Sequence, residues 1–514
     1  MTDILLGQAY HLRFDPKLWR AMEPYPPLGT LYAAAVLRRC GYTVALHDSM
    51  LAESVREWTA ALDRVRPRYA ILYEDNFNYL SKMCLLRMRD AAMHMIASAG
   101  ERGCTTIVCG ADATDHYADY LEGGVDYVLL GEGEETLQQL LDSLEGRSHV
   151  DLKDIQGIAY VEDGQVVTTP RRPVIRRLDD LPRPAWDLVD VERYRRIWLE
   201  RHGYFSINMI TSRGCPFHCN WFAKPIWGQR YNARSPQNVA DELTWLRDHL
   251  QASHIWFMDD MMGIKPGWMA SFADIVEAQG IRTPFKCLNR VDLLLRDGEI
   301  DALRRAGCRT VWTGVESGSQ KILDAMDKGI RVEQIREAAD RLHEAHIQVG
   351  FFIQFGYPGE TREDIAMTFD LIRRCRPDQI GVSVSYPLPG TKFYDSVREE
   401  LGKKQNWLDS NDLAMLHAGA FSTSFYRRLH RVLHKEFRAR KAYHVLRKQF
   451  SARTRPAAKH AREVAALLYN AATLPLERLK MERAARRPNE NPHASLGEFR
   501  GSLPPEAASV PTPQ

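Results

Sequence analysis

This 514-residue chain lacks the features that would place it outside the cytoplasm. Its 69 Lys and Arg against 66 Asp and Glu leave a formal charge of only +3, which draws it to neither nucleic acid nor membrane as a whole. No apolar run reaches the ~18 residues of a membrane span, and the amino terminus has no basic flank typical of a signal peptide. The nine cysteines are scattered, which argues against a secreted disulfide scaffold. We therefore expect a cytoplasmic protein that binds no nucleic acid.

Strand-like and helical patterns alternate over residues 1–145, from "DILLGQAY" to "LLGEGEETLQQLL". This order predicts an α/β domain with a doubly wound parallel sheet, whose ligand would lie beyond the carboxyl ends of the strands. Glycine and polar residues in the turns at that edge can bring backbone amides and side chains to a polar ligand. The candidates are Leu28, Gly29, Asp48, Gly110, Thr114, Gly131, Glu132 and Gly133. From periodicity alone, an ordinary sheet with glycine turns explains the pattern equally well.

A hairpin and linker over residues 146–203 are predicted to lead into a second α/β domain over residues 204–400. "GIAYVEDGQVVTTP" is typical of a hairpin, and the Pro- and Arg-rich stretch after it is typical of a linker. Six strand–helix units then predict a partial (β/α)6 barrel, with active-site residues at the carboxyl ends of its strands. The polar residues at those ends include Asp259, Arg290, Glu316, Ser317 and Gln354.

The loop after the first barrel strand, "TSRGCPFHCNWFAKPIWGQR", contains Cys215 and Cys219. A third cysteine three residues later would complete a Cys-x-x-x-Cys-x-x-Cys cradle for an iron–sulfur cluster. Phe222 occupies that position, and its ring offers no lone pair to iron.

Several motifs occur in a fixed order: "PPLGTLYAAAVLRRCGY", "GADAT", "LLGEGEETLQQLL", "TSRGCPFHCNW", "FMDD", "GVESGSQKILDAMDKGI", "FGYPGET" and "PLPGT". Over roughly residues 1–400 this set resembles the cobalamin-binding class of radical S-adenosylmethionine proteins. The resemblance implies cobalamin at the eight turn residues of the first domain and S-adenosylmethionine at the five strand-end residues of the barrel. It also implies a four-iron cluster on Cys215 and Cys219, methyl transfer or a related radical reaction, and an electron donor protein.

The first domain lacks the Asp-x-His-x-x-Gly signature that supplies a cobalt ligand in other cobalamin proteins. His11, His47 and His116 stand outside that context and are expected to be surface or turn histidines. Bound cobalamin is therefore expected in the base-off form.

Phe222 leaves three interpretations open. His218 or Cys287 could supply the missing ligand of an active enzyme, although Cys287 is more typical of a residue packed inside the barrel. Alternatively, the chain could be a catalytically silent homologue that binds cobalamin or a substrate, or an enzyme that works by polar chemistry without a cluster. A single recent change, natural or introduced, explains one altered position in an otherwise matching loop better than long decay.

Residues 401–487 are predicted to be helical and basic, and residues 488–514 a disordered Pro-rich tail. One helical face is apolar: Phe425, Leu429, Val432, Leu433, Phe437, Tyr443 and Leu446. Such a face could lie on an anionic membrane, bind an anionic substrate, or pack on the barrel. The sequence does not name the substrate, for which a small molecule or a lipid- or glycan-like compound is expected.

Overall fold

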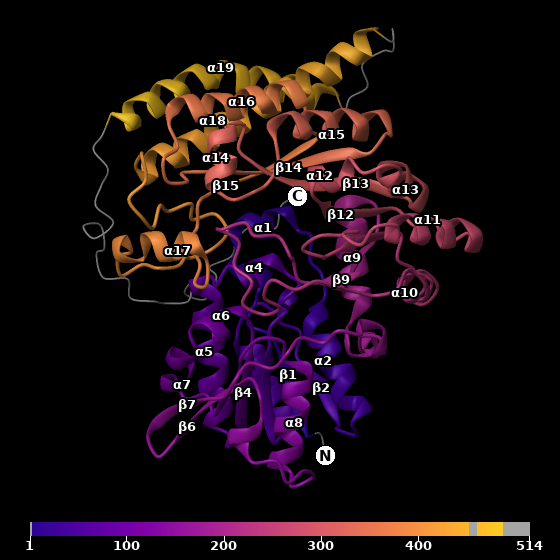
Figure 1. Ribbon diagram of the computed structural model, residues 1–514, viewed down its shortest axis with the longest axis vertical. Coiled ribbons are helices and arrows are strands. Elements are labelled where there is room, and N and C mark those ends of the chain that lie inside the picture. Colours follow the sequence, from indigo (N-terminus) through magenta and orange to yellow (C-terminus); the bar gives the residue numbers. More distant parts are fainter. Residues whose placement is uncertain (1–2, 452–459, 487–514) are drawn as a thin grey trace.

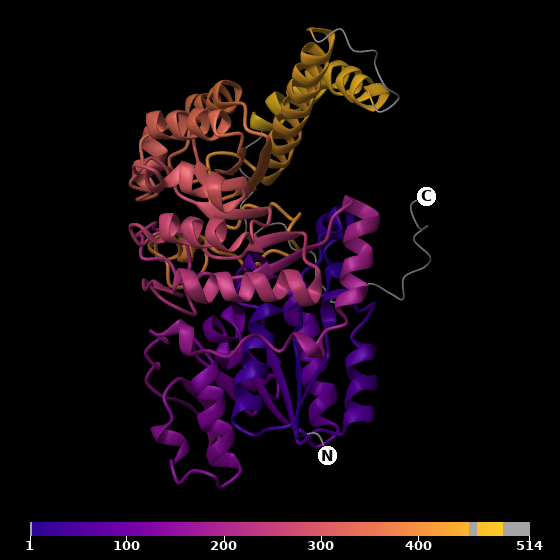
Figure 2. The same ribbon diagram turned by 90° about the vertical axis from the view of Figure 1, so that its right-hand side faces the viewer.

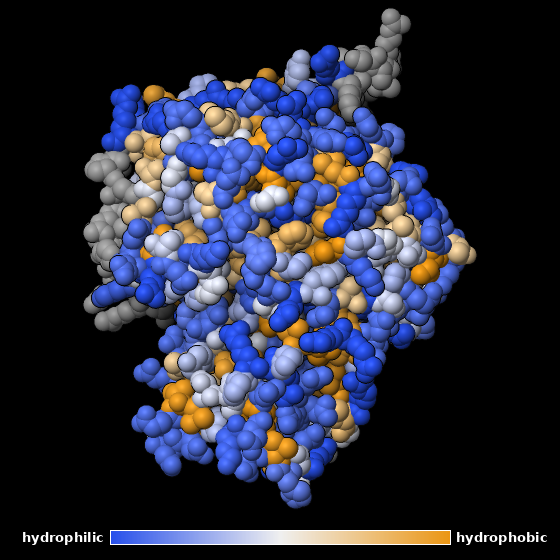
Figure 3. Space-filling view, viewed as in Figure 1, coloured by the Kyte–Doolittle hydropathy of each residue, from blue (hydrophilic) through white to orange (hydrophobic). Residues whose placement is uncertain are grey.

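The computed structural model describes residues 3–451 and 460–486, so the tail predicted after residue 488 lies outside the described residues. It contains a seven-stranded sheet followed along the chain by a six-stranded sheet, with a long helical pair at the end (Figure 1). The face drawn in Figure 3 is mostly hydrophilic, with apolar residues in small scattered groups. Within the described part of the chain, no helix is both long and apolar enough to traverse a bilayer.

The first sheet has the strand order β2-β1-β3-β4-β5-β6-β7, and its first five strands are parallel. These strands are β1 (Ile4–Gly7), β2 (Val44–Leu46), β3 (Tyr69–Tyr73), β4 (Thr105–Cys109) and β5 (Tyr127–Leu129). The predicted hairpin is present as β6 (Ile158–Glu162) and β7 (Gln165–Thr168). It does not stand in the linker, however, because β6 pairs with β5 and extends the same sheet.

Helices cover both faces of this sheet, as a doubly wound fold requires. α2 (Leu28–Arg39) and α8 (Glu134–Leu144) pack on one face, and α3 (Arg56–Val65) and α5 (Leu86–Gly100) on the other. Alternate strand residues point to opposite faces, so Leu6 joins the first of these cores and Leu5 the second. The predicted fold class of the first domain is confirmed.

The second sheet is parallel throughout, in the order β15-β14-β13-β12-β11-β8. Its strands are β8 (Ser206–Met209), β11 (His254–Phe257), β12 (Phe285–Asn289), β13 (Cys308–Glu316), β14 (Gln348–Phe355) and β15 (Gln379–Val384). The helices that follow them include α10 (Pro236–Leu250), α11 (Trp268–Gln279), α13 (Glu299–Ala306), α15 (Val332–Glu344) and α16 (Arg362–Cys375). This is the predicted partial (β/α)6 barrel.

Shorter helices complete the two domains. They are α1 (Pro16–Ala21), α4 (Tyr79–Lys82), α6 (Ala111–Asp115), α7 (Tyr117–Glu122), α9 (Val191–His202), α12 (Val291–Leu294), α14 (Gln320–Ala325) and α17 (Lys392–Val397). α9 lies in the crossing segment and joins the domains, because the Trp198 indole donates a hydrogen bond to the Pro24 carbonyl at 2.8 Å.

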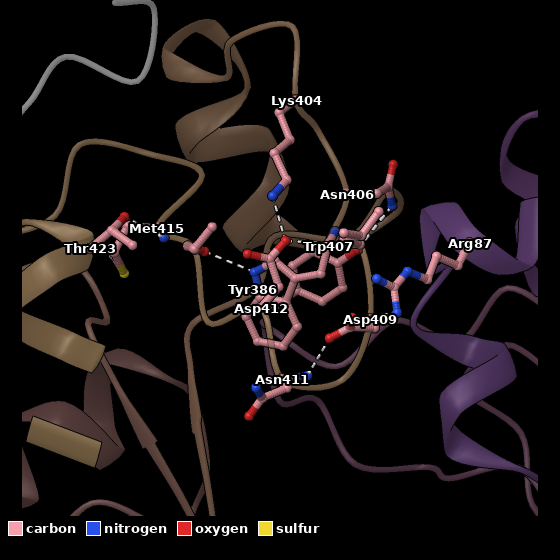
Figure 4. A network of polar contacts seen from close by, with 12 residues as sticks. Arg87, Tyr386, Lys404, Asn406, Trp407, Asp409, Asn411, Asp412, Met415 and Thr423 are labelled. Atoms are coloured by element: carbon pink, nitrogen blue, oxygen red, sulfur yellow. Dashed lines mark hydrogen bonds and ion pairs between the residues drawn. The ribbon is translucent and has the colours of Figure 1, made fainter. Parts of the chain in front are cut away.

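The segment of residues 401–422, predicted to be helical, contains no helix and instead folds back from the barrel onto the first domain. Its Trp407 stacks on Tyr386 of the barrel with ring centroids 4.3 Å apart, and the Trp407 carbonyl accepts from the Leu86 amide at 2.9 Å. Asp409 lies 3.0 Å from Arg87 of α5, and Figure 4 shows these two side chains next to each other. These contacts fix the barrel against the first sheet at a second place.

The chain ends in a helical pair, α18 (Thr423–Ser451) and α19 (His460–Ala485), which extends away from the barrel (Figure 2). Four residues of the apolar face predicted on α18 are buried in the core shared with the barrel: Phe425, Leu429, Val432 and Leu433. This part of the face therefore packs on the barrel and is closed to a membrane or a substrate. Tyr443, nearer the free end of α18, is exposed.

Candidate functional site

The carboxyl edges of the two sheets face each other across the domain boundary. The segment after β3 contributes Phe77, which stacks on Trp227 of the barrel with ring centroids 5.2 Å apart. Lys82 from the same segment forms an ion pair with Asp260 after β11. The loops that carry the predicted residues of both domains therefore meet in one region.

A ligand site of a doubly wound sheet lies where the strand order reverses, which here is between β1 and β3. The two loops at this switch point touch, because the Ala9 amide donates to the Glu74 carboxylate at 2.7 Å. Several buried side chains around it have a polar atom without a hydrogen-bond partner among the described residues: Gln8, Tyr10, His11, His47, Ser49, Glu74, Asn76 and Ser81. Buried polar groups normally have hydrogen-bond partners. The atoms without one therefore indicate that a polar ligand binds at this edge.

The eight turn residues predicted for cobalamin lie at this same edge, but their contacts are largely with the protein. The Gly29 amide donates to Asp75 at 3.0 Å, and the Thr114 hydroxyl accepts from the Gly131 amide at 3.2 Å. Asp48 accepts from the Tyr194 hydroxyl at 2.6 Å. Leu28 is buried at the start of α2, and Glu132 pairs with Arg213 of the barrel.

The predicted glycines let these loops approach one another. A Cβ at Gly110 would lie 2.8 Å from the Glu74 side chain, and one at Gly133 would lie 2.5 Å from the Cys109 sulfur. These residues shape the edge, while Gln8, Glu74 and Asn76, which sequence reasoning missed, carry the unpartnered polar atoms. His11 and His47, expected to be surface or turn histidines, lie in the turns after β1 and β2 but are buried rather than exposed. Burial lowers the pKa of His47 to about 4, so its imidazole is neutral.

The cysteine loop is fixed at both ends by a short antiparallel pair, β9 (Ser212–Arg213) and β10 (Asn232–Ala233). Gly214 follows with a φ of +83°, and a Cβ there would lie 2.3 Å from the Arg230 carbonyl oxygen. Only glycine fits that backbone conformation and that close approach.

The two thiols of the loop differ in their surroundings. Cys215 is buried, and burial raises the pKa of its thiol. Cys219 is half-buried, and its sulfur lies 3.9 Å from the guanidinium of Arg290, which also lies over the Phe217 ring at 4.0 Å. Phe222 is half-buried with its ring edge-on to Trp221, at a centroid distance of 5.7 Å.

Neither alternative ligand completes the cradle. The His218 side chain is exposed, and Cys287 is fully buried in β12, where its thiol contacts Cys308. Over residues 3–451 and 460–486, no group of three or more His, Cys, Asp or Glu side chains is arranged to hold a metal ion. A cluster held by three thiolates does not fit the donor set of this loop.

Arg213, directly before the cysteine loop, joins the barrel to the first domain. It is 2% exposed, and its guanidinium lies 2.5 Å from Glu132 and 2.8 Å from Glu134. It also lies 5.3 Å from the ring centroids of Tyr32 and Phe77. The cysteine loop is thus held against the edge of the first sheet by a buried ion pair.

The five residues predicted for S-adenosylmethionine are all buried at the carboxyl edge of the barrel. Asp259 accepts hydrogen bonds from the Thr211 amide at 2.9 Å and the Ser212 hydroxyl at 2.6 Å, so it holds the start of the cysteine loop. Burial raises the pKa of Asp259 to about 6. Glu316 has a φ of +61° and lies 2.8 Å from Lys328.

Of the other three, Arg290 pairs with Asp292 at 2.7 Å, and the Ser317 hydroxyl lies 3.2 Å from that of Thr368. Gln354 has a side-chain oxygen without a hydrogen-bond partner among the described residues.

Further buried polar atoms in the barrel, also without a partner in the described chain, belong to Asn208, Asn289, Thr313 and Ser385. Asn289 and Thr313 are register partners on β12 and β13. Three of them lie within runs that the sequence identifies as strands, "FSINMI", "FKCLNR" and "TVWTG". The prediction examined the residues after each strand and so passed over them.

Comparison with known proteins was made on sequence and on structure. A model of the Radical SAM superfamily matches residues 209–372. An anaerobic magnesium-protoporphyrin IX monomethyl ester cyclase of Synechocystis is 30% identical over 73% of this chain and 74% of its own length. An uncharacterized methyltransferase of Pyrococcus horikoshii is 31% identical over 55% of this chain, and the match spans only 60% of that relative.

The structure of the cobalamin-dependent S-adenosylmethionine radical enzyme OxsB aligns with a TM-score of 0.69 and 16% identity, covering 94% of this chain and 72% of that one. Fold and site define a class, an α/β domain followed by a partial barrel whose cysteine loop packs against the edge of the first sheet. The chain belongs to the Radical SAM superfamily, and its fold is that of the cobalamin-dependent enzyme OxsB.

Proposed function

We propose that this chain binds cobalamin and S-adenosylmethionine between its two sheets and is built for methyl transfer to a small-molecule or lipid-like substrate. The observation that carries the proposal is the pair of facing edges, each with buried polar atoms that lack a partner in the described chain. Methyltransferases among its relatives support the same reaction class. Bound cobalamin supplies a methyl group that can pass to a substrate.

The residues of each edge have separate roles in this proposal. Gln8, Glu74 and Asn76 offer hydrogen bonds to the polar periphery of cobalamin at the switch point. Asn289, Thr313 and Gln354 offer hydrogen bonds to S-adenosylmethionine inside the barrel. Such sites use a few convergent polar groups in an otherwise apolar cavity to fix the orientation of the ligand.

The iron–sulfur cluster is the part of the family's machinery that these residues do not fit. Only Cys215 and Cys219 offer thiolates, so a radical step and its electron donor depend on a third ligand that the loop does not provide. Phe222 therefore favours a second candidate function, a silent homologue that binds cobalamin or a substrate without starting a radical.

Cobalamin retention tests the binding claim that both candidates share. Full-length protein incubated with hydroxocobalamin and then desalted should retain about one corrin per chain, with a base-off spectrum because the usual histidine signature is lacking. Gln8→Met should weaken retention about fivefold, since one hydrogen bond contributes ~1 kcal/mol. Gln379→Met is the matched control, because Gln379 is exposed at the amino end of β15.

Full-length protein that keeps no corrin would show that the first domain is an α/β module without this ligand. A base-on spectrum would instead identify a histidine ligand, with the buried His47 as the first to replace.

A further inference from the structure

Helix α19 turns an apolar face to the solvent. Its exposed large side chains are Val464, Leu468, Tyr469, Leu476 and Leu479, with exposed fractions of 40% to 65%. Val464, Leu468, Leu476 and Leu479 follow one another at spacings of three, four or eight residues, which places them on one side of a helix. We call these five residues the α19 stripe.

The opposite side of the same helix faces α18 and the barrel and is also largely apolar, because Leu474, Met481 and Ala484 pack against the core there. Asn470 is buried there, and Glu477 lies 3.2 Å from Arg428 of α18. A helix that packs on a protein with one side normally presents polar residues to water on the other side. The α19 stripe is instead a second apolar side, which indicates that something other than water covers it.

A groove of about 720 Å³ runs beside the stripe between α18 and α19. Its lining includes the apolar residues Tyr443, Leu467, Ala471, Leu474 and Pro475. Arg440 and Arg478 also line it and both pair with Glu436 of the same lining, so two cations stand against one anion there. The stripe and the groove together form one apolar surface with cationic residues beside it.

The positive charge around this surface favours a negatively charged binding partner. The two helices contain thirteen Lys and Arg against four Asp and Glu, although the whole chain carries only +3. Two copies of this surface would repel each other, whereas an anionic surface would be attracted. Lys435 illustrates the arrangement, because its ammonium lies 5.0 Å from the ring centroid of Tyr469, a member of the stripe.

We propose that the α19 stripe docks on an anionic lipid surface. The apolar residues enter the boundary between headgroups and acyl chains, and the cations of both helices contact the lipid phosphates. This attachment holds the protein at the membrane without a span and leaves the facing sheet edges in the body of the molecule.

Flotation of full-length protein with lipid vesicles tests the proposal. The protein should bind vesicles of phosphatidylcholine with about one third phosphatidylglycerol and should bind pure phosphatidylcholine much more weakly. The double variant Leu468→Asp with Leu476→Asp should weaken binding at least about tenfold, since it removes two inserted side chains and adds two negative charges. Both positions are at least half exposed, so the variant should fold, which circular dichroism and thermal unfolding can verify.

The matched control is Leu199→Asp with Met367→Asp, which makes the same change in charge at two exposed helical positions outside the pair. It should bind as tightly as the unaltered protein. Failure to bind the anionic vesicles, or equal losses in both double variants, would overturn the proposal. A dimer that the stripe variant abolishes and the control keeps would also overturn it and assign the stripe to a second copy.

Discussion

Arg213 is the residue whose loss should cost the fold most. Its guanidinium is buried between the domains and pairs with Glu132 and Glu134. Arg213→Met leaves two carboxylates buried without their cation, so the free energy of unfolding should fall by about 3–5 kcal/mol. Urea unfolding measures this change. Arg38→Met is the control, because Arg38 and its partner Asp187 are largely exposed and that pair should contribute at most about 1 kcal/mol.

Glu74 should make the stability of the protein depend on pH. Burial raises the pKa of its carboxyl from 4.5 to about 8. Between these values the folded chain keeps a proton that the unfolded chain has lost, so the stabilisation is complete below pH 4.5 and decreases as the pH rises toward 8. The slope from this one group is at most about 1.4 kcal/mol per pH unit.

Glu74→Gln, which cannot ionise, should flatten this dependence in urea unfolding of the protein without added cofactor. Glu122→Gln, at an exposed position, should leave it unchanged. An unaltered slope in Glu74→Gln would mean that another buried group, such as Asp115 with a pKa raised by burial to about 7, accounts for the dependence.

For single residues, the sequence predicts which turns lie at the site. It predicts less well which side chains face a ligand. Turn glycines such as Gly110 and Gly133 can be recognised at the edge because they follow strand-like runs. Their role in letting loops approach could not be predicted, because the neighbours, Glu74 and Cys109, come from other segments. The positions of Gln8 and Asn289 in the candidate site follow only from the strand order, which brings strand ends from distant parts of the chain together.

Among the elements, α18 and α19 differ in which of their faces is covered. Leu429→Ala on α18 should lower the free energy of unfolding by roughly 2–5 kcal/mol, because that side chain is fully buried against the barrel. Leu468→Ala on α19 should change it by at most about 0.5 kcal/mol, because that side chain is 65% exposed. Equal losses from the two variants would contradict the described packing of the helical pair.

The sequence predicts that residues 401–487 are helical, but among the described residues of this region the helices begin at Thr423. Periodicity also does not show which face of each helix is buried. The α18 pattern of Phe425, Leu429 and Val432 shows an apolar face, and only the barrel beside it shows that this face is core. The hairpin of β6 and β7 is a similar case, since Asp163-Gly164 predicts the turn. Its pairing with β5 is a long-range contact that leaves no mark within the hairpin itself.

At the scale of the whole molecule, two parallel sheets share one site region because their carboxyl edges meet. The alternation of strands and helices predicts both sheets, and a family resemblance predicts their combination. The contacts that hold the domains together were not predictable in detail. Residues 401–422 are predicted to be helical, yet they form no helix, and Trp407 and Asp409 bind the segment to the first domain.

Assembly of an iron–sulfur cluster on the cysteine loop is the most direct test of this account, because it distinguishes a complete enzyme from a protein that only binds its ligands. We propose that Cys215 and Cys219 are two of three cluster ligands and that Phe222 interrupts the set. The measurement is anaerobic reconstitution with iron and sulfide, followed by assay of bound iron and of S-adenosylmethionine cleavage. The chain as it stands, Phe222→Cys and Phe222→Ser are compared side by side, and the serine variant removes the ring without adding a thiolate.

Phe222→Cys should bind about four irons per chain and cleave S-adenosylmethionine, since three thiolates can then hold the cluster. The unaltered chain and Phe222→Ser should do neither. Four irons in the unaltered chain would contradict the account and reveal a ligand outside the loop's two cysteines, and an iron-free Phe222→Cys would show that this loop is not a cluster site.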